Sequence, residues 1–149
     1  MDTSTHRDEQ RRTLCQFACE AEAGPLGVRR LRTAAGAQLA AWGWPARSDV
    51  AQAVALVVAE LGANAATHGA RGGAVIVLRM GVLPDLAAPE AVRVEVTDAR
   101  GDVAPRTGCP SAEAVCGRGL LLVSALARRW GWYRNGVEAK TVWAEVAVG

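Results

Sequence analysis

The segment Glu60-Leu61-Gly62-Ala63-Asn64-Ala65-Ala66-Thr67-His68-Gly69 places three polar side chains four residues apart in a mostly apolar run. At about 3.6 residues per turn, Glu60, Asn64 and His68 lie on one stripe of a helix. An acid, an amide and an imidazole on an apolar helix need hydrogen-bonding partners, and a bound metal–nucleotide complex would supply them. A solvated polar face is the alternative explanation, so the stripe has to be weighed with the rest of the chain.

The composition is that of one globular domain. Of the 149 residues, 50% are hydrophobic and 21% are charged, which is enough to bury a sizeable core. The formal net charge is only +2 and the arginines are scattered, so we expect no direct binding to nucleic acid. Residues 1–12 are polar and are expected to form a flexible tail, without a signal peptide, before a domain at residues 13–149. No stretch has the length of a membrane span, so we expect a cytoplasmic protein.

The four cysteines are expected to stay reduced. Cys15 and Cys19 alternate with Phe17, which favours packing in the core. Cys109 and Cys116 have neither a CxxC spacing nor a nearby histidine, so a zinc site is not expected. The tryptophans are expected to pack in the core or at its rim; they are Trp42, Trp44, Trp130, Trp132 and Trp143.

Hydrophobic periodicity predicts the order of the elements. The expected strands are Leu14–Glu20, Ala74–Val82, Ala91–Thr97, Trp130–Arg134 and Thr141–Val148. The expected helices are Leu26–Trp42, a second one from Ser48 or Asp49 to His68, and Leu120–Arg128. Residues Ala99–Gly117 are rich in glycine and proline and lack periodicity, which predicts a mobile lid. This order fits a two-layer α/β sandwich with a mostly antiparallel sheet.

Four segments carry a resemblance to a known group of proteins: Glu60–Gly69, Val96–Gly101, Cys116–Leu122 and Ala139–Val146. They resemble, in order, the sequence boxes of the ATPase superfamily that includes gyrase, heat-shock chaperones, histidine kinases and mismatch-repair proteins. Within this superfamily, residues 14–148 resemble the short anti-sigma factor serine/threonine kinases. The resemblance implies the Bergerat ATP-binding fold, an α+β sandwich whose mixed, mostly antiparallel sheet is covered on one face by helices. It also implies that the protein binds ATP and Mg²⁺.

The first two boxes would bind the metal ion and the adenine ring, and the first would also supply the catalytic base. By the resemblance, the amide oxygen of Asn64 holds Mg²⁺ and Glu60 activates the attacking group, which suits the preference of Mg²⁺ for oxygen ligands and the ability of a carboxylate to accept a proton. Asp98 would accept the adenine amino proton, with Gly101 in the loop behind it. The glycine that the family usually has two residues after this aspartate is Arg100 here. A turn-forming aspartate at a strand end is the alternative for Asp98.

The third box would cover the phosphates, and the fourth would support the residue that binds adenine. By the resemblance, Gly117–Gly119 form a lid that leads into a helix starting at Leu120, and a helix N-terminus favours phosphate. Arg118 either contacts a phosphate or faces water. Thr141 would support Asp98 by hydrogen bonding, often through water; a β-branched strand residue without that role is the alternative. Neither a Rossmann nor a P-loop fingerprint occurs in the chain.

The resemblance implies a regulatory protein serine/threonine kinase. Such a protein would sequester a sigma factor, phosphorylate an anti-anti-sigma antagonist and form a homodimer, with positioning and electrostatics supplying most of the rate. A nucleotide-dependent partner-binding module without significant kinase activity is a second hypothesis, and the altered second box motivates it. A histidine-kinase catalytic fragment is disfavoured, because no phosphoacceptor helical hairpin is found and neither His6 nor His68 suits that task.

Overall fold

The computed structural model describes residues 14–66, 74–84, 89–98, 115–135 and 139–148, with the side chains of residues 14, 15 and 115–119 outside this description. The elements are, in order, β1 (Leu14–Glu22), α2 (Pro25–Ala41), α3 (Asp49–Asn64), β2 (Val75–Pro84), β3 (Pro89–Asp98), α4 (Val115–Leu126), β4 (Arg129–Arg134) and β5 (Lys140–Ala147). The predicted order of strands and helices is therefore confirmed. The expected tail and most of the expected lid lie outside the described residues.

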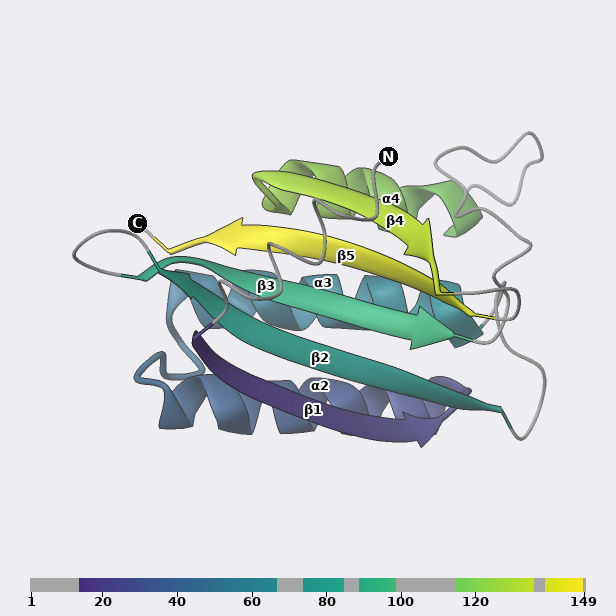
Figure 1. Cartoon of the computed structure of the whole chain (residues 1–149), viewed down its shortest axis with the longest axis horizontal. Helices are drawn as coiled ribbons and strands as arrows, with labels where there is room; N and C mark the ends of the chain where they lie inside the picture. Colours follow the sequence, from purple (N-terminus) through teal and green to yellow (C-terminus); the bar gives the residue numbers. More distant parts are fainter. Residues whose placement is uncertain (1–13, 67–73, 85–88, 99–114, 136–138, 149) are drawn as a thin grey trace.

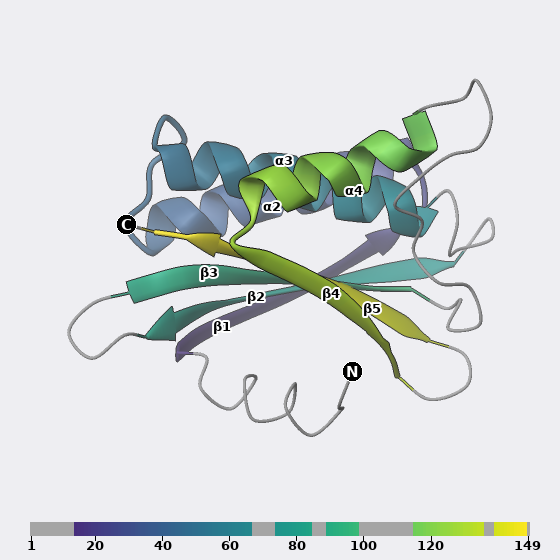
Figure 2. The same cartoon turned by 90° about the horizontal axis from the view of Figure 1, so that it is seen from above.

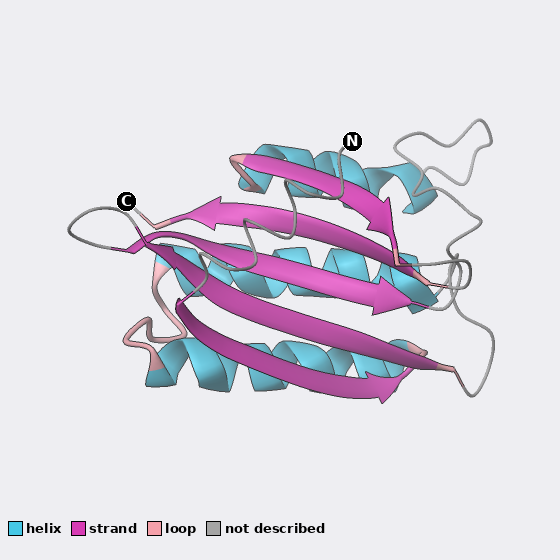
Figure 3. Ribbon diagram, in the orientation of Figure 1, coloured by secondary structure: helices cyan, strands magenta, loops and turns pink. Residues whose placement is uncertain are grey.

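The five described strands form one sheet in the order β1-β2-β3-β5-β4 (Figure 1). Helices α2, α3 and α4 all lie on the same face of it, as the view in Figure 2 and the colouring in Figure 3 show. The α+β two-layer sandwich is thus confirmed. A mixed sheet was expected, but every ladder among the described strands is antiparallel. The connection through α4 and β4 brings β5 back beside β3 in the opposite direction.

The hydrophobic core fills the space between the sheet and the helices. Alternation along β3 points Val92, Val94 and Val96 at the helices, and each is at most 1% exposed. Apolar side chains at helical spacing on α2 and α3 pack against them, among them Leu31, Leu39, Val54, Val58 and Leu61. Burying a side chain of this size stabilises the fold by about 1.5–3 kcal/mol relative to leaving it exposed.

Cys19 and the five tryptophans lie in or beside the buried parts of the fold. Cys19 is half-buried against the core, as expected, and burial raises the pKa of its thiol. The tryptophans that pack against the core are Trp42, Trp44, Trp130 and Trp132. Trp143 is buried on the other face of the sheet, where Arg93 lies 4.2 Å from the ring centroid. The side chains of the other three cysteines are not described.

The two N-terminal helices begin where the sequence predicts. Gly24 has φ 145°, which suits glycine, and Pro25 follows at the first turn of α2. The Ser48 hydroxyl accepts a hydrogen bond from the backbone N–H of Ala51 at 3.2 Å and caps α3. The α-helical part of α3 ends at Asn64, and the predicted end at His68 lies outside the described residues.

Two boundaries differ from the prediction in the second half of the chain. Helix α4 begins at Val115, five residues before the predicted start at Leu120, and ends at Leu126. Glycines disfavour helix, so sequence alone assigned Gly117–Gly119 to a loop, but apolar side chains further along α4 are buried and anchor it. Strands β2 and β3 also extend into the expected loop at residues 83–90, with Pro84 opposite Pro89 at the strand ends where proline is tolerated.

Glycine lets α2 approach two neighbours closely. A Cβ atom at Gly27 would overlap the backbone carbonyl oxygen of Glu22, so only glycine fits there. A Cβ at Gly62 of α3 would lie 3.1 Å from Cγ1 of Val28. Close packing at Gly62 was expected against the sheet or a ligand, whereas its close neighbour in the structure is helix α2.

Two glycines of the same helix should respond in opposite directions to alanine. Gly27→Ala is expected to lower the free energy of unfolding by about 1–3 kcal/mol, because the backbone of Glu22 would have to move. Gly36→Ala adds a methyl group where no atom lies within 4 Å, so it should stabilise the protein by about 0.5–1 kcal/mol through helix propensity. Urea unfolding followed by tryptophan fluorescence measures both. Equal effects of the two substitutions would contradict the packing described for Gly27.

Candidate functional site

Four elements bring their ends together at one end of the molecule. Asn64 is the last residue of α3, Asp98 the last of β3 and Lys140 the first of β5, and α4 begins at Val115. Figures 1 and 2 both place these four element ends on the same side of the fold. The arrangement follows from antiparallel pairing, because the end of β3 must then meet the start of β5. Two segments far apart in the sequence, the first and second boxes, therefore have described residues at the same end of the fold.

Asn64 presents a buried acceptor that has no partner in the part of the chain that the structure describes. The residue is 8% exposed, and its side-chain oxygen Oδ1 has no hydrogen-bond partner among the described residues. A buried polar atom left in this state costs about 1–3 kcal/mol. Glu60 lies one turn earlier on the same side of α3 and is half-buried. An unsatisfied oxygen next to a carboxylate suits a ligand that brings its own positive charge or donors.

Asp98 and Lys140 form a buried ion pair at the meeting point of β3 and β5. They are 2% and 0% exposed, and Nζ of Lys140 lies 3.6 Å from Oδ2 of Asp98. Sequence reasoning selected Asp98 but did not select Lys140. The available signal was that Lys140 is the only lysine of the chain and starts a strand in which most residues are apolar. Lysine is almost never fully buried unless it is paired.

Thr141 has different partners from those expected. Its hydroxyl lies 2.7 Å from the hydroxyl of Thr97 and accepts a hydrogen bond from the side-chain amide of Asn135 at 2.6 Å. Thr97 and Thr141 are opposite each other in the ladder, as Asp98 and Lys140 are one residue along. Because neighbouring strand residues point to opposite faces, Thr141 lies on the face away from Asp98. The side chain that contacts Asp98 from β5 is that of Lys140.

The phosphate-binding candidates are placed in part. Gly117–Gly119 lie in the first turns of α4, so the backbone N–H groups of a helix N-terminus open onto this end of the fold. Leu120 is 1% exposed and packs in the core, which makes it an anchor for α4. The side chain of Arg118 and the whole of Gly101 lie outside the description.

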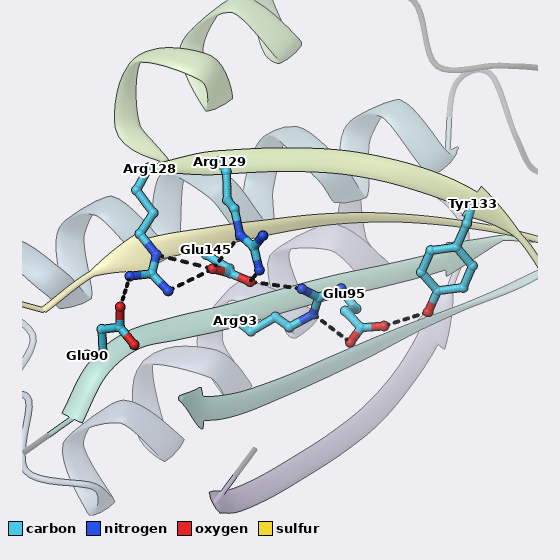
Figure 4. Close-up of polar contacts among 7 residues, drawn as sticks. All are labelled: Glu90, Arg93, Glu95, Arg128, Arg129, Tyr133 and Glu145. Carbon is cyan, nitrogen blue, oxygen red and sulfur yellow. Dashed lines mark hydrogen bonds and ion pairs between the residues drawn. The ribbon is translucent and has the colours of Figure 1, made fainter. Parts of the chain in front are cut away.

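A second polar cluster lies on the face of the sheet that carries none of the described helices (Figure 4). We call it the charged network; its members are Glu90, Arg93, Glu95, Arg128, Arg129, Tyr133 and Glu145. At its centre Glu145, 0% exposed, accepts hydrogen bonds from Arg93, Arg128 and Arg129, each at 2.9 Å for the shortest contact. Alternation in β3 places Arg93 on this face, but the sequence pattern does not predict that it is buried.

The charged network extends toward the site through Glu95. This carboxylate accepts hydrogen bonds from Nε of Arg93 at 3.1 Å and from the hydroxyl of Tyr133 at 2.9 Å. Burial, together with the nearby charge of Glu95, raises the pKa of Tyr133 to about 12. Tyr133 therefore stays protonated and acts as a donor at neutral pH. None of these residues was selected from the sequence, and each of them forms a hydrogen bond with another member of the network.

The described residues contain no helix long and apolar enough to cross a membrane. They also contain no group of three His, Cys, Asp or Glu side chains placed to hold a metal ion. Mg²⁺ commonly uses one or two protein ligands and completes its shell with phosphate oxygens and water. A single amide oxygen such as that of Asn64 suits this way of binding.

Comparison with known proteins identifies the family. A family model described as the histidine kinase-like ATPase domain matches residues 21–146. The chain belongs to this family. Its α+β sandwich is consistent with the Bergerat-like ATPase fold, and membership implies ATP binding. No curated protein sequence matches the chain.

A solved structure gives the same fold. It contains the RsbU and RsbW domains of Rv1364c from Mycobacterium tuberculosis and superposes with a TM-score of 0.63 at 18% sequence identity. The match covers 91% of this chain but only 34% of the other, so the chain spans about a third of that protein's length. At this level of identity the likeness shows the fold alone.

The residues present fit ATP with Mg²⁺. The unpaired Oδ1 of Asn64 is a hard oxygen ligand, and the carboxylate of Asp98 can accept from an amino group of a base. The N-terminus of α4 offers backbone donors for phosphate. The chemistry of each position thus matches one part of the nucleotide.

Proposed function

We propose that this protein is an ATP-binding regulator of the anti-sigma type and acts as a serine/threonine protein kinase. In this role it binds a sigma factor and phosphorylates an anti-anti-sigma antagonist, working as a homodimer. The observation that carries the proposal is the buried, unpartnered oxygen of Asn64 at the end where Asp98 and the start of α4 also lie. Family membership and the fold shared with an RsbW-containing protein support it.

Each side chain has one task in the proposed reaction. Asn64 holds Mg²⁺ through Oδ1, and Asp98 accepts a hydrogen bond from the adenine amino group. The backbone N–H groups at the start of α4 bind phosphate oxygens. Glu60 accepts the proton of the Ser or Thr hydroxyl as that oxygen attacks the γ-phosphorus. The bond between the γ-phosphorus and the oxygen that bridges it to the β-phosphate breaks, ADP leaves, and Mg²⁺ held by Asn64 would help to neutralise the charge on it.

Transfer of label from ATP tests the kinase proposal. Purified protein is mixed with γ-labelled ATP, Mg²⁺ and the antagonist candidate whose gene lies beside the one for this chain, or one recovered by pull-down. Label on a Ser or Thr of the antagonist supports the kinase. Nucleotide binding without any transfer would contradict the kinase and leave a nucleotide-dependent partner-binding module.

Asn64→Ala is expected to separate ligand binding from stability. The substitution removes an acceptor that has no partner in the described structure, so the free energy of unfolding should not fall. The affinity for ATP in the presence of Mg²⁺ should drop by about tenfold or more, because a direct metal ligand is lost. Calorimetric titrations with Mg²⁺ and with EDTA measure this difference.

Gln52→Ala is the matched control, since Gln52 is exposed on the same helix away from the site. It should leave both the affinity and its dependence on Mg²⁺ unchanged. If Asn64→Ala unfolds the protein, or binds ATP with an unaltered response to Mg²⁺, the metal-ligand role is refuted.

A further inference from the structure

Lys140 occupies an unusual environment for a lysine. Its side chain is 0% exposed, and it faces the helices in the same row as the core residues Val142 and Ala144. Removing an ammonium group from water costs several kcal/mol, and a close counter-ion recovers only part of that cost. A neutral side chain of similar size would fill the space more cheaply. The charge of Lys140 therefore calls for an explanation beyond packing.

An ion pair links this charge to Asp98. Nζ of Lys140 lies 3.6 Å from Oδ2 of Asp98, a carboxylate that is itself 2% exposed. Without a nearby cation, burial favours the protonated form of a carboxyl group. An ammonium group at this distance favours the ionised form. Lys140 thus favours the form of Asp98 that only accepts hydrogen bonds.

The protonation state of Asp98 determines which purine base it can bind. An ionised carboxylate only accepts hydrogen bonds, whereas a protonated one can also donate. Adenine presents an amino donor at its 6-position, and hypoxanthine and guanine present a carbonyl acceptor there. An acceptor-only Asp98 binds the amino group and repels the carbonyl, but a protonated Asp98 could bind either.

We propose that Lys140 is a positioning residue that enforces selectivity for adenine over 6-oxopurines by keeping Asp98 ionised. This inference rests on the nucleotide site proposed above and deepens it. Lys140 acts through Asp98 and touches no reacting atom. The competing explanation is that the pair only stabilises the fold, and this predicts equal losses for every nucleotide.

The experiment compares ATP with ITP, whose base is hypoxanthine, in the presence of Mg²⁺. Calorimetry gives both dissociation constants for the wild type, Lys140→Met and Lys140→Arg. The wild type should prefer ATP. In Lys140→Met the ratio of the two constants should fall by about tenfold or more. Lys140→Arg keeps the positive charge and should keep most of the preference.

The double variant Lys140→Met/Asp98→Asn guards against misfolding, since it removes both charges of the buried ion pair together. An amide both donates and accepts, so this variant should bind ATP and ITP with similar affinity. Equal weakening of ATP and ITP in Lys140→Met, or a double variant that retains the wild-type preference, would overturn the role of Lys140. Wild-type protein that binds neither nucleotide would overturn the proposed function itself, and this inference with it.

Discussion

Glu145→Ala is expected to lower the free energy of unfolding by about 3–5 kcal/mol, because it removes the carboxylate that binds all three guanidinium groups of a partly buried cluster. The carboxylate of Glu145 is 0% exposed and binds three guanidinium groups. Arg93 is 1% exposed and would lose its ion pair with Glu145 while keeping the one with Glu95. Urea unfolding monitored by circular dichroism gives the magnitude.

Glu90→Ala provides the matched control, because it breaks another ion pair of the same network. Glu90 binds Arg128 at 2.6 Å, but the side chains are 45% and 31% exposed. Solvent screens such a pair, so its loss should cost at most about 1 kcal/mol. Equal costs for Glu90→Ala and Glu145→Ala would contradict the central position given to Glu145.

Acid should remove the contribution of Glu145. Burial by itself raises the pKa of this carboxyl group, but hydrogen bonds from Arg129 and Arg128 outweigh it and hold the pKa below its ordinary value. A group whose pKa is lowered by folding stabilises the native state fully above its unfolded pKa, which is about 4.3 for glutamate. That stability is lost as the pH falls below this value toward the folded pKa. The difference in unfolding free energy between the wild type and Glu145→Gln should therefore shrink as the pH falls below about 4.3.

Glu60→Gln is expected to reduce phosphoryl transfer by about 10²–10⁴-fold while ATP still binds. An amide has nearly the same shape as the carboxylate but cannot take the hydroxyl proton. Single-turnover transfer to the antagonist measures the chemical step, and calorimetry measures binding separately.

Asp98→Asn supplies the contrast, since it should weaken ATP binding itself. It removes the negative charge from a position that is 2% exposed and next to Lys140. A Glu60→Gln protein that no longer binds ATP would refute the role of Glu60 as the base. A Glu60→Gln protein that transfers the phosphoryl group at the wild-type rate would refute it as well.

Periodicity and local chemistry were sufficient for the order of the elements. Alternating valines define β3, and helical spacing with the Ser48 cap defines α3. The start of α4 could not be predicted, because intrinsic propensity penalises Gly117 and Gly119 and only tertiary burial of residues such as Leu120 compensates.

The candidate site was predicted in outline but not in its details. The resemblance to the family's sequence boxes selected Asn64 and Asp98, and the fold brings the ends of their elements to the same side of the molecule. The ladder register then decides which of two adjacent β5 residues lies opposite Asp98. A register shifted by one residue would place Thr141 there, whereas the observed register places Lys140 there. The burial of Glu145 depends on side chains from three strand and loop segments, which sequence patterns do not relate to one another.

The central claim is that Mg²⁺-ATP binds where α3, β3, β5 and α4 meet. Titration of isotopically labelled protein with ATP and Mg²⁺, followed by backbone amide chemical shifts, tests it most directly. Saturable changes are expected to be largest around Asn64, Asp98, Lys140 and the first turn of α4, and to weaken when Mg²⁺ is removed. Absence of saturable binding, or changes centred on the charged network around Glu145, would contradict the claim.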